Sequence, residues 1–124
     1  MNIIISNSSG KPIYEQITAQ IKNMIMTGQL ASGDLLPSIR LLAKELRISV
    51  ITSKRAYEDL ERDGFITTVA GKGCYVSPGN KELLREQQLR QIEGYFQEAI
   101  ELASIAGITC EELGEILNML CKET

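Results

Sequence analysis

The sequence predicts a mainly α-helical protein with a small β-wing, organised as a winged helix-turn-helix followed by a two-helix dimerisation hairpin. Three patterns predict this fold class. Two short helical patterns lie close together in residues 37–63, a strand-glycine-strand pattern follows in residues 65–77, and a long heptad-like pattern begins after residue 79. We therefore expect a winged helix-turn-helix domain in residues 1–78 and a dimerisation tail in residues 79–124.

The N-terminal part of the chain is expected to support the helix pair. Residues 3–5 predict a short strand, and Pro12 suits the start of a helix because a first helical residue needs no N–H. Apolar residues recur at helical spacing through residues 13–25, which predicts a core helix. A second brief strand is expected at Leu35-Leu36, because Pro37 disfavours helix at the residue before it.

Residues 37–63 carry the predicted helix pair. The first helix has apolar residues at the spacing i, i+3, i+4 and i+7, which gives one buried face: Ile39, Leu42, Ala43 and Leu46. Ser38 can cap this helix and Ser49 the next, because a serine hydroxyl accepts a backbone N–H at a helix start. Gly64 can end the second helix, because glycine adopts positive φ without strain. That helix is expected to bury Ile51, Ala56 and Leu60.

The helix pair is also the most basic part of the chain. Between Arg40 and Arg55 there are five basic residues against one acidic residue. A second helix that begins with small polar and basic side chains is typical of a helix-turn-helix that enters the DNA major groove. On this helix pair and the ribbon after it, the predicted DNA contacts are Arg40, Lys44, Ser49, Val50, Thr52, Ser53, Lys54, Arg55, Gly71, Lys72 and Gly73.

The ribbon that follows the helix pair is predicted to be a wing. Residues 65–69 and 74–77 have the composition of two strands, and residues 70–73 supply a turn with two glycines. Glycine suits this turn because it accepts backbone angles that other residues resist. Lys72 would lie at the tip of the wing, where its ammonium group can reach a phosphate or the minor groove.

Residues 79–124 are predicted to fold as two helices that pair two copies of the chain. The first helix is expected over residues 80–106 and to end at Gly107, and Thr109 with Glu112 forms a capping box for the second. A hairpin of this size cannot enclose a core alone, so its apolar stripe is expected to pack on a second copy. The predicted dimerisation residues are Leu89, Ile92, Phe96, Ala99, Ala103, Leu113 and Leu117.

The charge balance is compatible with a nucleic-acid partner. The formal net charge is -3, but residues 1–78 carry nine basic and seven acidic side chains, whereas residues 79–124 carry four and nine. Screening over about 8 Å keeps the acidic tail from cancelling a basic contact surface. No apolar run approaches the ~20 residues that span a bilayer, and the start lacks the pattern of a signal peptide. We therefore expect a cytoplasmic protein without membrane contact.

No catalytic or metal chemistry is expected. Three cysteines without a CxxC pair, in a chain without histidine, argue against a disulfide framework and against the common zinc sites. Phosphate-binding glycine loops and an evident nucleophile with its base are also missing, so we expect no enzyme activity, no catalytic residue, no cofactor and no metal. The cysteines are expected to be plain reduced thiols, with a thiol sensor as the alternative.

Several segments match one known pattern in register. They are Pro12-Ile13-Tyr14-Glu15-Gln16-Ile17, Gly28-Gln29-Leu30, Gly33-Asp34, Leu36-Pro37-Ser38-Ile39-Arg40, Leu42-Ala43, Arg55-Ala56-Tyr57, Leu60-Glu61, Gly64, Gly71-Lys72-Gly73 and Tyr75-Val76. Together these segments resemble the winged-helix domain of the GntR family of bacterial transcription factors, over about residues 11–77. The two-helix tail is similar to the YtrA subgroup of that family. This resemblance implies a homodimer that represses an operon, often one for ABC-type transporters.

The resemblance assigns the family's DNA contacts to Arg40, Ser49, Thr52, Lys54, Gly71 and Lys72. Family members commonly carry arginine and then a polar residue after the capping serine, whereas here Val50 and Ile51 follow it. An arginine that could pair with guanine is therefore absent, so base reading can shift to Thr52, to Lys54 or to an apolar contact between Val50 and a thymine methyl. Arg47 stands where glycine is usual, which implies a left-handed or altered turn at a cost of about 1 kcal/mol.

The mechanism that we expect is repression by a homodimer on double-stranded DNA. Two recognition helices would enter major-groove faces about 34 Å apart on a pseudo-palindromic operator. A small-molecule effector of unidentified chemistry would release the DNA. The alternative is a winged-helix protein-interaction module that does not bind DNA, in which the basic residues only form a solvated face. Salt-dependent DNA affinity separates these two functions, because neutralising phosphates releases counterions.

Overall fold

The computed structural model describes residues 1–79 and 81–124, and the chain divides into two compact units. The units are Met1–Leu84 and Arg85–Thr124. This division falls inside a helix, a few residues after the boundary that we predicted between residues 78 and 79. The two predicted domains remain a prediction.

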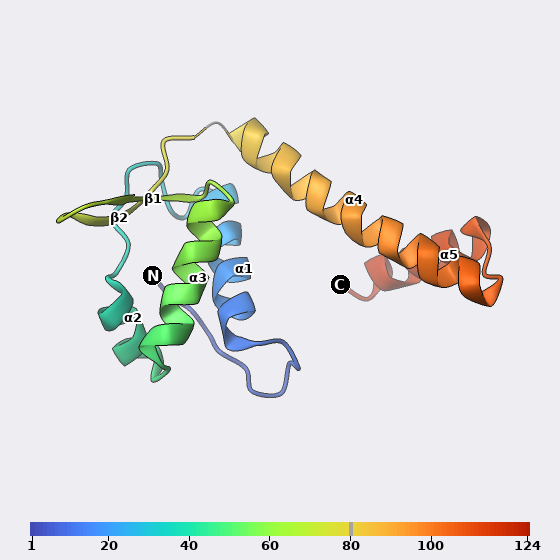
Figure 1. Cartoon of the computed structure of the whole chain (residues 1–124), viewed down its shortest axis with the longest axis horizontal. Coiled ribbons are helices and arrows are strands. Elements are labelled where there is room, and N and C mark those ends of the chain that lie inside the picture. Colours follow the sequence, from blue (N-terminus) through green and yellow to red (C-terminus); the bar gives the residue numbers. More distant parts are fainter. Residues whose placement is uncertain (80) are drawn as a thin grey trace. The chain divides into compact units, whose positions relative to one another are not determined.

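The first unit contains three helices and a two-stranded antiparallel sheet (Figure 1). Its elements are α1 (Ile13–Met26), α2 (Ile39–Leu46), α3 (Val50–Arg62), β1 (Ile66–Val69) and β2 (Gly73–Val76). A mainly helical chain with a small β-wing was predicted, and this fold class is confirmed. Pro12 was expected to be the first helical residue, but it is the cap that precedes α1.

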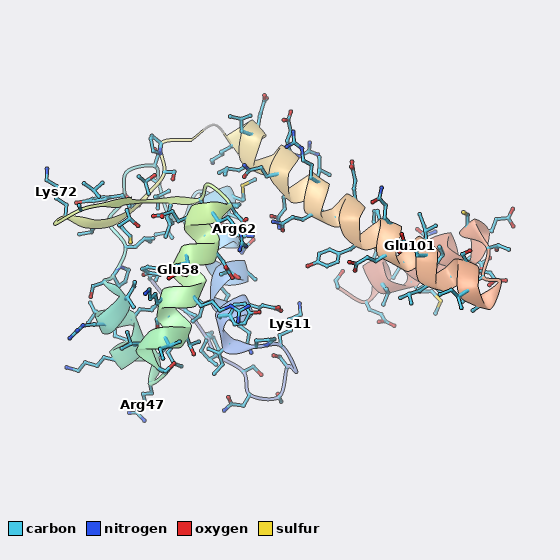
Figure 2. The ribbon with its side chains drawn as sticks, viewed as in Figure 1. Lys11, Arg47, Glu58, Arg62, Lys72 and Glu101 are labelled. Carbon is cyan, nitrogen blue, oxygen red and sulfur yellow. The ribbon has the colours of Figure 1, made fainter. Side chains whose placement is uncertain are left out.

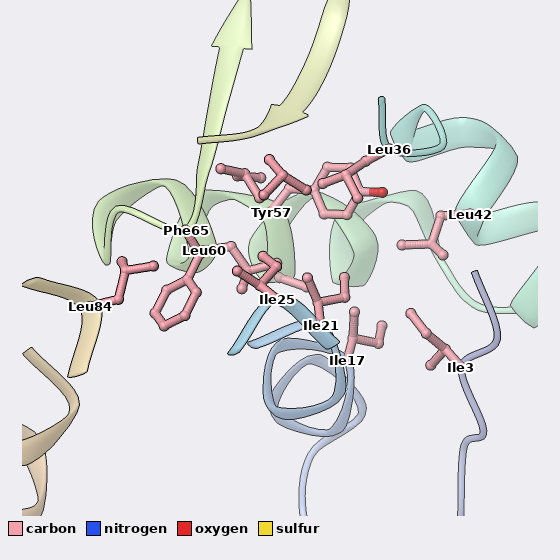
Figure 3. Close-up of a cluster of buried hydrophobic side chains, with 13 residues drawn as sticks. Ile3, Ile17, Ile21, Ile25, Leu36, Leu42, Tyr57, Leu60, Phe65 and Leu84 are labelled. Atoms are coloured by element: carbon pink, nitrogen blue, oxygen red, sulfur yellow. The ribbon is translucent and has the colours of Figure 1, made fainter. Parts of the chain in front are cut away.

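The core of the first unit lies where one face of α1 meets one face of α3 (Figure 3). Ile17 and Ile21 of α1 and Leu60 of α3 have no exposed surface, and Phe65 beyond α3 is also buried. The apolar residues of α1 recur at helical spacing, so they form a single stripe along the helix. Leu84 joins the same cluster from the helix that begins at Lys81. The packing fixes which face of α3 is left outside.

Hydroxyl caps start the two helices of the helix-turn-helix, as predicted. The backbone N–H of Leu41 donates to Ser38 Oγ at 3.1 Å, and that of Thr52 donates to Ser49 Oγ at 3.0 Å. Each bond satisfies a donor that has no partner inside the helix. The hydroxyl of Tyr57 donates to the carbonyl oxygen of Pro37 at 2.7 Å, which ties α3 to the start of α2.

Residues 1–6, before α1, have no regular secondary structure, so the prediction of a strand at residues 3–5 is wrong. The side-chain amide of Gln20 takes the place of a neighbouring strand. The N–H of Ile4 donates to Gln20 Oε1 at 2.9 Å, and Gln20 Nε2 donates to the oxygen of Ile4 at 2.7 Å. Gln16 makes the same pair of bonds with Ser6, at 2.8 and 2.9 Å. Side chains of α1 therefore hold the N-terminal segment.

The second predicted strand, at Leu35-Leu36, is reduced to a single bridge. Leu35 pairs with Tyr75 in antiparallel fashion outside the two named strands. The N–H of Leu36 donates to the oxygen of Cys74 at 2.9 Å, and the N–H of Val76 donates to the oxygen of Asp34 at the same distance. This bridge attaches the base of the wing to the segment that leads into α2.

The tail contains two helices, α4 (Lys81–Ala106) and α5 (Cys110–Lys122). Gly107 ends α4 with a φ of 70°, and the N–H of Glu112 donates to Thr109 Oγ1 at 3.2 Å, so both predicted helix boundaries are confirmed. The predicted helix start at Asn80 lies outside the described residues. Within the part of the chain that the structure describes, no helix is long and apolar enough to cross a bilayer.

An ion pair joins the C-terminal half of α1 to the residue that ends α3. Lys22 Nζ lies 2.9 Å from Asp63 Oδ2, both side chains are about 15% exposed, and the same ammonium group lies 5.2 Å from the centre of the Phe65 ring. Burial by itself raises the pKa of the Asp63 carboxyl. The hydrogen bond and the charge of Lys22, together with the charge of Arg62, outweigh burial and hold this pKa below its usual value.

We expect Asp63→Asn to lower the free energy of unfolding by about 2 kcal/mol at pH 7. A carboxyl with a depressed pKa in the folded state stabilises the protein above its unfolded pKa of about 3.9. That contribution is lost as the pH falls through the folded pKa, so the gap between variant and wild type should close in acid. Urea unfolding at pH 7 and at about pH 3 measures both effects.

Glu58→Gln is the matched control, because it breaks an exposed pair with Lys54 at 3.8 Å. It should change the stability by less than about 0.5 kcal/mol at either pH. A loss for Asp63→Asn that stays the same size in acid would contradict the assignment of the effect to this charge.

Candidate nucleic-acid interface

The exposed face of α3 is the one opposite its buried stripe. Ala56, Tyr57 and Leu60 are buried, whereas Ile51 is 80% exposed and Val50 is 48% exposed. Our prediction that Ile51 is buried is wrong. Ala56 lies five positions after Ile51, and at about 100° per residue this spacing places the two on different sides of the helix. The first turn of α3 therefore presents two apolar side chains to the outside.

The hydroxyl groups at the start of α3 are engaged with each other or with the backbone. Ser49 Oγ is hydrogen-bonded to Thr52 Oγ1 at 2.8 Å, in addition to its role as the cap. Ser53 has no exposed surface, and its hydroxyl donates to the carbonyl oxygen of Ser49 at 3.2 Å. This burial contradicts the prediction that Ser53 contacts DNA. Ser49 is exposed and Thr52 is half-buried.

Both cations of the first two turns of α3 already have partners within the first unit. Lys54 Nζ lies 3.8 Å from Glu58 Oε1 in an exposed pair. Such pairs are worth at most about 1 kcal/mol, so Lys54 can exchange this partner for a phosphate. The guanidinium of Arg55 stacks 3.8 Å from the centre of the Tyr14 ring of α1. Arg55 would have to leave that ring to reach DNA.

Three further cations lie on α2 and at the turn after it. Arg40 and Lys44 are on α2. Arg47, which Figure 2 labels, is the residue that ends this helix. All three are exposed, and among the described residues none of their side chains forms a hydrogen bond or ion pair. Sequence reasoning left Arg47 out of the contact set, although it is one of the five cations counted in this segment. Three free cations beside α3 favour an anionic partner.

Arg47 is the single residue other than glycine with a positive φ in the described chain. Its backbone has φ 56° and ψ 48°, the left-handed conformation that we expected at this position. The N–H of Arg47 donates to the oxygen of Lys44 at 3.3 Å, and the N–H of Ile48 donates to the oxygen of Ala43 at 3.0 Å. These bonds close the last turn of α2 and redirect the chain into α3.

The wing is a tight antiparallel ribbon with its lysine at the tip (Figure 2). The N–H of Lys72 donates to the oxygen of Val69 at 2.9 Å, and Gly71 supplies the positive φ of 77° that this turn needs. A side chain on Gly73 would have to adopt a φ of 113° with its Cβ 3.4 Å from Leu35. The two glycines therefore shape the turn, and the exposed Lys72 supplies its charge.

The predicted dimerisation residues of the tail differ in exposure. Leu89, Ile92, Phe96 and Leu117 are 40–48% exposed, and Ala99 and Leu113 are half-buried. Ala103 is only 4% exposed in the single chain, which contradicts a contact between Ala103 and a second copy. Phe96 and Leu117 line an apolar hollow between α4 and α5.

The tail exposes further apolar side chains that the heptad pattern missed. Tyr95 and Leu102 are each 70% exposed, and Ile105 is 84% exposed. These residues lie off the heptad-like stripe and were not among the predicted dimerisation residues. Apolar side chains are therefore exposed on more than one side of α4.

Comparison with known proteins gives a consistent relationship. The family described as bacterial regulatory proteins, gntR family, matches residues 13–76. Over 113 aligned residues the chain is 39% identical to the HTH-type transcriptional repressor YtrA of Bacillus subtilis (strain 168). The alignment covers 91% of this chain and 87% of that protein.

Two solved structures are similar to this chain over most of its length. A transcriptional antiterminator from Listeria monocytogenes EGD-e aligns with a TM-score of 0.73 and 30% identity, over 98% of this chain and 90% of that one. YtrA from Sulfolobus acidocaldarius, a GntR-family transcription factor, aligns with a TM-score of 0.59 and 38% identity, over 73% and 97%.

We expect Arg47→Gly to raise the free energy of unfolding by about 0.5–1 kcal/mol, because glycine removes the Cβ that opposes the left-handed turn. Arg47→Ala is the matched control. It removes the same guanidinium but keeps the Cβ, so it should give no gain. Urea unfolding of the two variants and the wild type tests the difference. Equal stability of the glycine and alanine variants would show that the turn is not strained.

Proposed function

The chain belongs to the gntR family of bacterial regulatory proteins, and on this premise we propose that it represses an operon as a homodimer bound to a pseudo-palindromic operator. It is a DNA-binding transcription regulator with a winged helix-turn-helix. We propose four further points: that the protein acts as a repressor, that it is a homodimer, that its operator is symmetric, and which residues contact DNA.

The observation that carries the proposal is the set of free cations around α3. Arg40, Lys44 and Arg47 flank the helix, and Lys72 extends the charge to the tip of the wing. In a helix-turn-helix the second helix enters the major groove while its partner helix meets the backbone. We assign Arg40 and Lys44 to phosphates, the first turn of α3 to the groove, and Lys72 to a phosphate or the minor groove.

The exposed apolar surface of the tail supports a second copy as its cover. Leu89, Ile92 and Phe96 recur along α4 at heptad-like spacing and remain 40–48% exposed in the single chain. Burying apolar area of this kind is the main driving force of association. A closed two-fold pair would present two copies of α3, which suits an operator with two related half-sites.

Repression follows from occupancy of a promoter by the dimer, which excludes polymerase. YtrA of Bacillus subtilis is described as a transcriptional repressor, and this supports the same sign of regulation here. The similarity of the tail to the YtrA subgroup suggests an operon for an ABC-type transporter as the target. A small-molecule effector that favours the free dimer would release the DNA. Because bacterial DNA lies in the cytoplasm, we expect the protein to act there.

A protein-interaction module remains the second candidate, because Ile51 and Val50 expose apolar surface at the front of α3. Such a module would not bind DNA. The two functions differ in salt dependence, since log K for a phosphate-binding protein falls linearly with log salt.

We expect Arg40→Ala combined with Lys54→Ala to weaken binding to a genomic DNA fragment selected with the purified protein by about 100-fold. The salt slope should fall by about 1 for each phosphate contact removed. Fluorescence anisotropy at several salt concentrations measures both quantities. Arg85→Ala combined with Arg90→Ala removes the same charge from the tail and should leave affinity near the wild-type value. Unchanged binding by the first double variant would show that the contact assignment is wrong.

We expect Ile92→Glu combined with Phe96→Glu to convert the dimer into a monomer, because a dimer interface would have to bury two carboxylates without partners. Light scattering on a sizing column gives the mass, and circular dichroism checks that the helices persist. Ile4→Glu changes an equally apolar residue that is 74% exposed in the first unit, and it should leave the mass unchanged. A wild-type protein that is already monomeric would end the dimer proposal.

A further inference from the structure

The first turn of α3 has an unusual surface for a helix that meets nucleic acid. Ile51 is 80% exposed and Val50 beside it is 48% exposed, and neither belongs to the buried core. Exposing so large an aliphatic side chain on a helix that carries the binding charges is unfavourable in water. Ile51 and Val50 are therefore expected to contact an apolar group of a binding partner.

The charges around this apolar pair identify the kind of partner. Lys54 follows Val50 by four residues and Ile51 by three, so it lies on the same face of the helix. Arg47 precedes the helix, and its guanidinium has no partner in the described chain. A lipid interior or an apolar protein groove would be a poor match for cations placed so close to the patch. A polyanion that carries apolar groups is a good match.

Hydrogen-bond donors are scarce at the same place. The hydroxyls of Ser49 and Thr52 are bonded to each other at 2.8 Å, and Ser53 is buried. Apart from the ammonium group of Lys54, the described side chains at the start of α3 therefore offer few free donors or acceptors for reading a base. In the major groove, the one apolar group that distinguishes a base is the 5-methyl group of thymine.

We propose that Ile51, with Val50 beside it, reads thymine methyl groups in the major groove, so that each operator half-site carries thymine beneath the first turn of α3. The inference rests on the proposed DNA-binding function and adds the chemistry that its sequence recognition uses. It moves the apolar contact expected at Val50 mainly to Ile51, because Ile51 is the more exposed of the two.

The test uses an operator selected from a random duplex library with the full-length protein. Each thymine of the selected site is then replaced in turn by deoxyuridine, which lacks only the 5-methyl group and keeps the same base pairing. We expect one or two positions in each half-site to lose about 3- to 10-fold in affinity, measured by anisotropy at fixed salt. Deoxyuridine outside the half-sites should have no effect.

A double-mutant cycle then assigns the methyl contact to the side chain. Ile51→Ala should weaken binding to the thymine operator by about 10-fold. The same variant should no longer distinguish thymine from deoxyuridine at the sensitive position, because the two changes remove the same contact. Ile4→Ala is the control, since Ile4 is 74% exposed and lies outside the helix-turn-helix. It should keep full sensitivity to deoxyuridine.

The outcomes separate the inference from the function on which it rests. Methyl sensitivity that disappears in Ile51→Ala supports the proposal. Salt-dependent, sequence-specific binding without methyl sensitivity overturns the proposal and leaves the DNA-binding function in place. Selection that yields no preferred sequence overturns both. An Ile51→Ala variant that binds DNA normally but changes the mass of the dimer also overturns the proposal, because it shows that the apolar pair is a protein contact.

Discussion

The packing of α3 against α1 is the constraint on which the rest of the first unit depends. Ile17 and Ile21 on one helix meet Ala56 and Leu60 on the other, and these four residues have no exposed surface. A helix that buries one stripe must present the opposite stripe, and on α3 that stripe begins with Ile51. The core packing thus determines which side chains of α3 are exposed to a binding partner. Substitutions in this core would change the orientation of α3, and so the interface, although the substituted residues are not part of the interface.

Helix boundaries were predictable because each depends on a few neighbouring residues. Ser38, Ser49 and Thr109 cap helices as their sequence context predicts, and Gly107 ends α4. The strand expected at residues 3–5 failed for the opposite reason. A strand needs a partner that is distant in the chain, and here the amide of Gln20 in α1 takes that role. Sequence patterns describe such long-range pairing poorly.

The candidate interface was predicted less completely than the fold. Its basic character follows from composition, but the partner of each cation depends on three-dimensional packing. Arg55 stacks on Tyr14, which lies far away in sequence, and this pairing could not be inferred from the helix alone. Ser53 and Ile51 were each assigned to the wrong side of α3, since small errors in helical phase exchange buried and exposed positions. Arg47 was counted among the basic residues but was not assigned to DNA, because only the structure shows that its side chain has no partner in the described chain.

The two kinds of surface on the helix-turn-helix divide affinity from specificity. Arg40, Lys44 and Arg47 can meet phosphates, which are the same in every DNA sequence, so they give strength without choice. Ile51 cannot attract a polyanion, and it gains only where an apolar group meets it in the groove. Such an interface would bind any DNA duplex weakly and would select among DNA sequences by the shape of the groove and the positions of thymine methyl groups. Its discrimination against a single changed base would then be modest, because one methyl contact is worth less than a bidentate arginine on guanine. In the proposed dimer, two half-sites read together would multiply that modest discrimination, and the tail would then have a direct part in sequence recognition.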